Sequence, residues 1–432
     1  MIDIQVLRAD PKLVKQKAKQ KQSDVDVDAI LSLDKERIEL IQQVEALRQR
    51  RNEISSKMKG GKPDQASIDE GKQIKIELAD REKLLSETES DFKELLGAIP
   101  NLAMEHVPVG ETEDDNVITK TVGEKPQFDG FEPRPHWDIA KQRDLFDKER
   151  AVKISGSRFV YLKGGLVRLQ FAIIQFVMET LGDEEVIKKL VSENDLSIST
   201  KPFNPILPPA LLKTEPYKAS ARLNAEEVTY KLADDDLWLN ASAEHTLATM
   251  YWNETLPHKD LPIRYIGYST SFRREAGTYG KDTEGIIRLH QFDKLEMEIF
   301  SDADSGPDEH KLMIAVQEHL MGQLGLHYNF VQKSTADIGK PNASGVDLDC
   351  WFPGQNRYIE THTADYMTDY QARDLNIKTK KDGSNELVHT NDATAFALSR
   401  ILAAIVENYQ NQDGTVRVPE VLQKYMGDRK TI

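Results

Sequence analysis

Two long helical patterns occupy the first hundred residues of the chain. From about Asp28 to Met58, apolar residues recur mostly at three- and four-residue steps. A second pattern follows, with a heptad seam that has two polar interruptions: Ile74, Leu78, Arg81, Leu85, Thr88, Phe92, Leu95 and Ile99. Between the two patterns, the glycines and the proline of KGGKPD (59–64) break any helix. The pattern therefore predicts an antiparallel coiled-coil hairpin.

Beyond the hairpin the pattern changes twice. Residues 104–137 combine prolines, glycines and acids without a helical period, which predicts a linker. Helical stretches such as 166–181 then alternate with less regular segments. Strand-like pieces lie at 263–274, 286–300 and 347–361. The first two strands follow each other directly, which favours an antiparallel sheet. We therefore expect an α+β protein with a helical domain at 1–103, a linker, and a larger domain at 138–432.

Composition narrows the class of protein. The chain has 432 residues, is 39% hydrophobic and 30% charged, and carries a formal net charge of −15. We find no run of about 18 apolar residues and no secretory signal pattern, so we expect no membrane association. The single cysteine, Cys350, excludes an internal disulfide framework and is typical of a cytoplasmic protein. The acidic total argues against nucleic-acid binding unless basic residues cluster locally.

Basic residues do cluster, at the predicted tip of the hairpin. Residues 48–62 contain a single acid, Glu53, and the following basic residues: Arg48, Arg50, Arg51, Lys57, Lys59 and Lys62. One interpretation is a solvated helix end, which is what most charge runs are. The other is an arm that binds the phosphates of RNA.

Candidate chemistry begins at FRREAG (272–277), where a predicted strand meets its turn. Side chains two apart share a face of a strand, so Arg273 and Glu275 are expected to lie together. The arginine could bind a phosphate, and the glutamate could accept a hydrogen bond from an amino group. The alternative is an ordinary ladder of surface salt bridges across a hairpin. The glycine-rich loops of parallel-sheet nucleotide sites, GxGxxG and GxxxxGK[ST], are absent from the sequence.

Three other segments weigh against the salt-bridge ladder. In NASAEHTLATM (240–250), Ser242 and Glu244 stand on alternate positions before an apparent helix. Glu360 lies near the end of an otherwise apolar strand pattern and is a candidate metal ligand. Arg400 lies inside an apolar helical pattern, where it could be a surface residue or could point at a phosphate.

Together these segments resemble the seryl-tRNA synthetase family of class II aminoacyl-tRNA synthetases. The most specific likeness is FRREAGTYGKDTEGIIRLHQFDKLEM, supported by MIDIQVLRADP, PVGETEDDN, EPRPHWDIAK and DYQAR. The resemblance implies a homodimeric ligase whose catalytic domain has an antiparallel sheet flanked by helices. Such a protein activates serine with ATP and Mg²⁺ and transfers it to tRNA(Ser), with tRNA(Sec) as a further candidate.

The resemblance also implies roles for individual residues. Arg273 and Arg400 are the implied catalytic residues, and Glu360 is the implied Mg²⁺ ligand. The implied ATP-binding residues are Arg273, Arg274, Glu275, Arg288, Phe292, Glu360, Thr361, His362, Thr363 and Arg400. The implied serine-binding residues are Ser242, Ala243, Glu244, Arg273, Glu296, Asp392 and Thr394. The basic cluster at the hairpin tip becomes the implied tRNA-binding arm.

Two stretches depart from the family pattern. THTADY (361–366) stands where the family commonly has VSSCSN, and it brings His362 into an ATP-contacting stretch. TNDAT (390–394) stands where the family has TLNGS or TLNGT, so that Asp392 replaces an amide with a charge. The alternative function is therefore a synthetase-like paralogue with altered amino-acid specificity or without aminoacylation activity.

Overall fold

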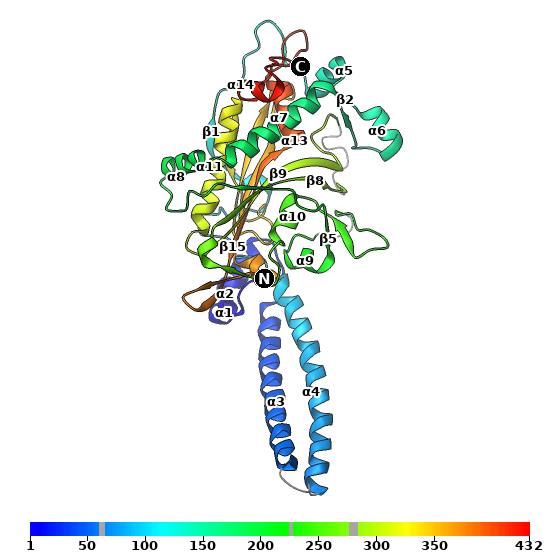
Figure 1. Ribbon diagram of the computed structural model, residues 1–432, viewed down its shortest axis with the longest axis vertical. Coiled ribbons are helices and arrows are strands. Elements are labelled where there is room, and N and C mark those ends of the chain that lie inside the picture. The colour runs from blue at the N-terminus through cyan, green and yellow to red at the C-terminus, as the bar shows by residue number, and fades with distance from the viewer. Residues whose placement is uncertain (60–64, 224–227, 276–283) are drawn as a thin grey trace. The chain divides into compact units, whose positions relative to one another are not determined.

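The first of two units, Met1–Leu102, is built from helices (Figure 1). These are α1 (Ile4–Ala9), α2 (Pro11–Gln20), α3 (Val27–Lys59) and α4 (Gln65–Ala98). The computed structural model describes residues 1–59, 65–223, 228–275 and 284–432. Helices α3 and α4 lie side by side as the predicted antiparallel hairpin (Figure 1).

The seam of the hairpin follows the predicted positions for most of its length. Ile74, Leu78 and Phe92 of α4 are buried. Near the end of the helix Leu96 is buried, whereas the predicted Leu95 is 41% exposed. A straight α-helix has 3.6 residues per turn, so the side of the helix that faces its partner drifts relative to a strict 3.5-residue repeat. That drift accounts for the change of register after Phe92.

The second unit, Ala103–Ile432, is organised around an eight-stranded sheet. In spatial order the strands are β1 (Val117–Val122), β10 (Tyr328–Gln332), β11 (Ser344–Phe352), β12 (Arg357–Thr368), β15 (His389–Ala397), β9 (Gln291–Ser301), β8 (Ile263–Phe272) and β4 (Asn204–Ile206). Only the edge strand β4 pairs parallel with its neighbour; the other pairs in this sheet are antiparallel. The predicted antiparallel α+β architecture is therefore confirmed.

Helices cover one face of this sheet (Figure 1). The long helices α7 (Gly164–Leu181), α11 (Gly306–Leu324) and α13 (Leu398–Asn408) share one hydrophobic core with the strands. The remaining helices are α5 (His136–Arg143), α6 (Lys148–Ser155), α8 (Glu184–Glu193), α9 (Thr214–Ala219), α10 (Ala243–Ala248), α12 (Tyr370–Leu375) and α14 (Glu420–Gln423), with 3₁₀ turns at Glu113–Asp115, His258–Asp260 and Lys424–Met426. Small sheets are formed by β2 (Phe146–Asp147) with β3 (Tyr161–Leu162), by β5 (Leu211–Lys213) with β6 (Leu237–Leu239), and by β7 (Thr255–Pro257) with β13 (Lys378–Lys381) and β14 (Ser384–Leu387).

The central strands carry different chemistry on their two faces. In β9, Leu295, Met297 and Ile299 pack in the core, so Lys294 and Glu296 must face the other way. The same alternation in β11 puts Val346, Leu348 and Cys350 in the core, with Asp347 and Asp349 on the opposite face. One face of the sheet therefore packs in the hydrophobic core, and the other carries charged side chains.

Several expected elements differ in detail. The strand expected at 347–361 is two antiparallel strands, β11 and β12, joined by a turn that contains Pro353 and Gly354. Within the segment expected to be a linker, β1 pairs with β10 and adds an edge strand to the sheet. Helix α7 is long and apolar enough to span a membrane by length and composition alone, although Arg168 and Glu179 interrupt its sequence. Its buried face packs in the central core, as expected of a core helix.

Candidate active site

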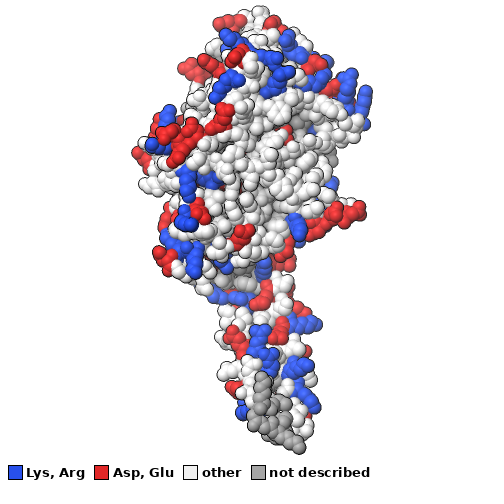
Figure 2. All heavy atoms as spheres, in the orientation of Figure 1, with Lys and Arg blue, Asp and Glu red and all other residues white. Residues whose placement is uncertain are grey.

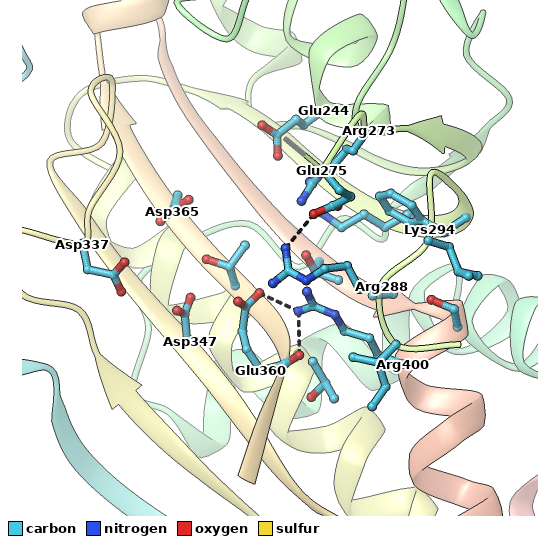
Figure 3. Close-up of a pocket in the computed structure, with 18 of the residues that line it drawn as sticks. Glu244, Arg273, Glu275, Arg288, Lys294, Asp337, Asp347, Glu360, Asp365 and Arg400 are labelled. Carbon is cyan, nitrogen blue, oxygen red and sulfur yellow. Dashed lines mark hydrogen bonds and ion pairs between the residues drawn. The ribbon is translucent and has the colours of Figure 1, made fainter. Parts of the chain in front are cut away.

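A polar pocket of about 260 Å³ opens on the charged face of the sheet (Figure 3). It is lined by Arg222, Glu244, Arg273, Glu275, Ile287, Arg288, Leu289, Phe292, Lys294, Lys333, Asp337, Asp347, Glu360, Thr361, Thr363, Asp365, Thr394, Ala397, Ser399 and Arg400. These residues come from strands β9, β11, β12 and β15, from helices α10 and α13, and from the segments that follow α9, β8 and β10. Residues far apart in the sequence therefore converge on one cavity.

Three arginines converge on this cavity from different elements. Arg288 Nη1 donates to Glu275 Oε2 at 2.6 Å. Arg400, in the first turn of α13, donates to the backbone oxygen of Glu360 and lies 3.1 Å from its carboxylate (Figure 3). Arg273 Nε donates to a backbone oxygen, and its guanidinium lies 5.3 Å from the centre of the Phe292 ring. The cavity therefore presents a concentration of positive charge suited to anionic ligands.

The position of Glu360 depends on a β-bulge. Opposite β11, Leu348 pairs with His362 but Asp349 pairs with Glu360, so Thr361 is an extra residue in β12. A bulge reverses the facing of the residues that precede it. It therefore brings Glu360 to the same cavity as Thr363, although simple alternation would separate them. Partial loss of hydration in the cavity favours the protonated acid, but Arg400 and Lys333 outweigh this effect and lower the pKa of Glu360, which keeps it ionised.

One end of the cavity is a dense set of buried polar groups. Lys294 Nζ donates to Glu296 Oε1 at 2.8 Å and to Ser242 Oγ at 3.3 Å. Thr394 Oγ1 also donates to Glu296 Oε1, at 3.3 Å, while Glu296 Oε2 has no hydrogen-bond partner in the described part of the chain. Burial raises the pKa of Glu296. This end is small and rich in hydrogen-bonding groups, which suits a small polar ligand.

Arg222 crosses the same end of the cavity and is buried there. Its guanidinium lies 3.0 Å from Glu244 Oε1 and 2.5 Å from Asp392 Oδ2. Burial raises the pKa of Asp392 well above its usual value, and Arg222 opposes that rise. Oxygens of Glu244, Glu296 and Asp392 lie within 4.8 Å of one another. Arg222 and Lys294 supply the positive charge that lets these carboxylates approach so closely.

Comparison with known proteins identifies the family. Residues 1–103 match the Seryl-tRNA synthetase N-terminal domain, and residues 228–409 match the tRNA synthetase class II core domain (G, H, P, S and T). The chain is 36% identical to the serine–tRNA ligase of Nitrosopumilus maritimus over the full length of both proteins. It is 38% identical to that of Symbiobacterium thermophilum over 98% of each. The chain belongs to the seryl-tRNA synthetase family.

A solved seryl-tRNA synthetase agrees with this assignment at the level of structure. The enzyme from Pyrococcus horikoshii, determined in complex with ATP, has a TM-score of 0.87 and 34% sequence identity to this chain. The alignment covers 100% of this chain and 99% of that one. The family and fold predicted from the sequence are therefore confirmed.

The structure brings most of the site residues implied by the seryl-tRNA synthetase resemblance to the cavity or its border. Eight of the ten implied ATP-binding residues line it; the exceptions are Arg274 and His362. Arg274 Nε donates to the backbone oxygen of Thr229, and its guanidinium stacks on the Tyr230 ring. Among the implied serine-binding residues, Glu244, Arg273 and Thr394 line the cavity, and Ser242, Glu296 and Asp392 contact its lining residues. Ala243 is buried in the first turn of α10.

His362 does not reach the cavity. It precedes Thr363 in β12, and alternate residues of a strand face opposite sides. Its ring therefore lies on the core side, 5.2 Å from the Phe396 ring, and its Nδ1 lies 2.8 Å from Thr361 Oγ1. Burial lowers the pKa of His362 to about 3, so the imidazole is neutral.

The reasoning that Arg273 and Glu275 share a strand face is wrong, although both reach the cavity. Strand β8 ends at Phe272, and Glu275 has a left-handed backbone with φ of +53°. The irregular backbone of residues 273–275, and not strand alternation, brings both side chains to the cavity. Ser242 is the N-cap residue of α10, and Glu244 lies in the first turn of that helix.

Sequence reasoning missed part of the lining. Arg222, Lys333, Asp337, Asp347 and Asp365 were not among the expected site residues, and all of them line the cavity. Asp347 could have been predicted from the sequence, because Asp347 and Asp349 interrupt the apolar pattern of β11 on the pocket face. Arg222 and Lys333 lie in irregular segments outside the strands, where no periodicity marks a face.

At the hairpin tip, acids partly neutralise the basic cluster. Arg48 pairs with Glu82, and Arg50 pairs with both Glu53 and Glu70. Figure 2 shows basic and acidic side chains interspersed along this face of the hairpin. Arg51 and Lys57 are exposed, and no ion pair to either is found among the described residues. The side chain of Lys59 and all of Lys62 lie outside the described part of the chain.

Proposed function

We propose that the cavity is the site where this chain, a serine–tRNA ligase, activates serine with ATP. The observation that carries the proposal is the convergence of Arg273, Arg288 and Arg400 with Glu360 in one cavity. Attack of the serine carboxylate on the α-phosphorus forms seryl-adenylate and releases pyrophosphate. This step builds charge on phosphoryl oxygens and needs no protein nucleophile, so fixed cations and precise positioning supply the catalysis.

The arginines divide the nucleotide between them in this proposal. Arg273 holds the α-phosphate, beside the serine end of the cavity, while Arg288 and Arg400 bind the outer phosphates. Phe292 stacks on adenine, and Glu275 accepts from its amino group. The pairs that Arg288 and Arg400 make with Glu275 and Glu360 keep the guanidinium groups oriented in the free protein.

Magnesium fits the donors on this side of the cavity. Glu360 is ionised and half-exposed, and Thr363 offers a hydroxyl oxygen nearby. Magnesium prefers such oxygen ligands and uses few protein carboxylates when phosphates also bind it. We propose that Glu360 holds a Mg²⁺ ion, which would neutralise charge on the phosphates.

The buried end of the cavity is proposed to bind serine. Glu296 and Thr394 can accept from and donate to a small hydroxyl group, and Glu244 and Ser242 border the same space. Alanine would leave these buried groups without partners, which is a strong basis for rejection. Arg222 neutralises Asp392, so the departure at this position is compatible with serine as the substrate.

The hairpin is proposed to bind tRNA(Ser) through the phosphates of its backbone. On this proposal, 1–103 is a tRNA-binding domain and the catalytic domain follows the segment 104–137. We further propose that the chain acts as a homodimer in the cytoplasm and that tRNA(Sec) is a second substrate to test.

ATP–pyrophosphate exchange tests the proposal without requiring the correct tRNA. The assay is run separately with serine, threonine, alanine, glycine and cysteine. Exchange with serine alone is the expected result. Exchange with another amino acid would preserve the chemistry and change the substrate, and no exchange with any of them would favour a paralogue without aminoacylation activity.

A pair of adjacent variants tests the phosphate assignment. Arg273→Ala should abolish exchange while leaving the thermal unfolding transition in place, because within the described residues its side chain makes a single hydrogen bond, to the backbone oxygen of Ala241. Arg274→Ala is the matched control, since Arg274 is next to it in sequence and does not line the cavity. An active Arg273→Ala protein would contradict the assignment.

A further inference from the structure

Lys333 is a buried cation on the acidic side of the cavity. Its ammonium donates to Thr363 Oγ1 at 2.8 Å and lies 3.0 Å from Asp365 and 3.3 Å from Asp347. Only 8% of its side chain is exposed. A lysine buried to this extent costs free energy unless nearby charges compensate for the lost hydration. Its position is therefore specified by the carboxylates around it.

The backbone beside Lys333 is shaped to let it reach these partners. Lys333 N donates to the backbone oxygen of Gly345 in the neighbouring strand. A Cβ atom on Gly345 would lie 2.4 Å from both Lys333 Cε and Asp365 Oδ1. The absence of a side chain at 345 therefore allows the lysine to cross the sheet surface as far as β12.

The charges on this side of the cavity are predominantly negative. Figure 3 shows Asp337, Asp347 and Asp365 across Glu360 from the arginines. Arg400 pairs with Glu360, so Lys333 is the cation that faces Asp347 and Asp365 among the described residues that line the cavity. Without it, two neighbouring carboxylates would lie beside Thr363 and Glu360. Such a set of oxygens would attract a divalent cation.

We propose that Lys333 is a built-in counter-cation of the nucleotide site, whose ammonium takes the place that an additional divalent ion would otherwise occupy beside Asp347 and Asp365. This inference rests on the proposed ATP-dependent function. It assigns Lys333 a positioning role: it holds Thr363 and the two carboxylates in place and limits the number of metal ions bound with ATP. The aspartates are then available to orient the lysine and do not need to bind a metal ion themselves.

The test counts metal ions directly. Mn²⁺ is titrated into the full-length protein in the presence of saturating α,β-methylene ATP, which resists cleavage between the α- and β-phosphates, and free Mn²⁺ is measured by electron paramagnetic resonance. Lys333→Met should bind one more Mn²⁺ per chain than the wild type, at least about tenfold tighter than any corresponding ion on the wild type. Lys333→Arg, which keeps the charge, should retain the wild-type number.

A charge-matched control separates this effect from damage to the fold. Lys333→Met/Asp365→Asn removes one charge of each sign and should return the number of bound Mn²⁺ ions towards the wild-type value. The same number of ions on Lys333→Met and the wild type would overturn the inference. A wild-type protein that does not bind the ATP analogue would overturn the proposed function itself, and the inference with it.

A second measurement applies if Lys333→Met does not fold. Asp347→Asn/Asp365→Asn keeps the lysine and removes both of its acidic partners. With an uncompensated ammonium beside the phosphates, this variant should bind the analogue at least about threefold tighter than the wild type in metal-free buffer. Unchanged or weaker binding would overturn the proposed role of Lys333.

Discussion

Replacing Arg222 tests whether its charge compensates that of Asp392. The Asp392 side chain is 1% exposed, and Arg222→Met would leave it without its cation. Removing one member of a buried ion pair typically costs about 3–5 kcal/mol of stability. We expect the lower end, about 3 kcal/mol at pH 7, because Asp392 can escape part of the cost by binding a proton. Its pKa is already raised well above the usual value by burial.

The double variant Arg222→Met/Asp392→Asn removes both charges and should recover most of that loss. Replacing a buried ion pair by neutral groups is often nearly neutral for stability. The double variant should therefore be more stable than Arg222→Met alone, with a coupling free energy of at least about 1.5 kcal/mol. Asp392→Asn alone is the second control, since it leaves Arg222 paired with Glu244.

The assay is urea unfolding followed by tryptophan fluorescence. The tryptophans Trp137, Trp238, Trp252 and Trp351 all lie in the second unit, so the signal reports that unit. Loss of Arg222 raises the pKa of Asp392 further in the folded state, so the folded protein binds more protons than the unfolded chain above about pH 4. The destabilisation relative to the wild type should therefore be smaller at acidic pH, where Asp392 is protonated in both folded proteins, and should grow with pH once the wild-type carboxylate ionises. A loss independent of pH, or a double variant as unstable as the sum of the single variants, would refute the reasoning.

Three further predictions address other parts of the chain. Charge reversal of Arg51 and Lys57 should weaken tRNA binding and reduce its salt dependence while leaving ATP–pyrophosphate exchange unchanged, and equal loss of both would contradict the division of labour. His136→Asn should raise the KM for ATP by about tenfold, because His136 Nε2 accepts from the backbone N–H of Ile286, two residues before Arg288. An unchanged KM, measured on the folded variant, would show that this contact does not position the arginine. Burial raises the pKa of Asp349 to about 6. Between about pH 4 and 6 the folded state therefore binds more protons than the unfolded chain, and this group lowers the stability of the fold as the pH rises through that window. Asp349→Asn should reduce that loss by on the order of 2 kcal/mol in urea unfolding, and identical pH profiles for the variant and the wild type would exclude the effect.

The fold could be predicted where the sequence has a regular period. The hairpin follows from three- and four-residue steps, and the order of β8 and β9 indicates an antiparallel sheet. The change from Leu95 to Leu96 could not be predicted, because a strict heptad does not include the drift of a straight helix. The end of β8 at Phe272 could not be predicted either. Arg273 continues the alternating pattern of the strand in the sequence, but in the structure it lies outside the strand.

The candidate site could be predicted from the family motifs more fully than from the physical pattern. Strand alternation alone would put Glu360 on the core side with His362; the bulge at Thr361 reverses this, and a bulge has no reliable sequence signal. The motif comparison correctly included Glu360 because it does not depend on alternation. For the same reason it included His362, which the strand carries to the opposite face.

The two acidic departures from the family pattern have a common explanation that only the structure reveals. Asp392, in TNDAT, and Asp365, the fifth residue of THTADY, each add a negative charge. Asp392 faces Arg222 and Asp365 faces Lys333, and both cations are buried and come from irregular segments. Arg222 is 170 residues from Asp392 in the sequence, so no local pattern could join them. Considered one residue at a time, the departures suggest an altered substrate. Considered as pairs, they preserve the charge balance of the pocket, because an added acid with its own cation leaves the net charge seen by ATP and serine unchanged. Retained serine specificity is therefore the more economical interpretation of both departures.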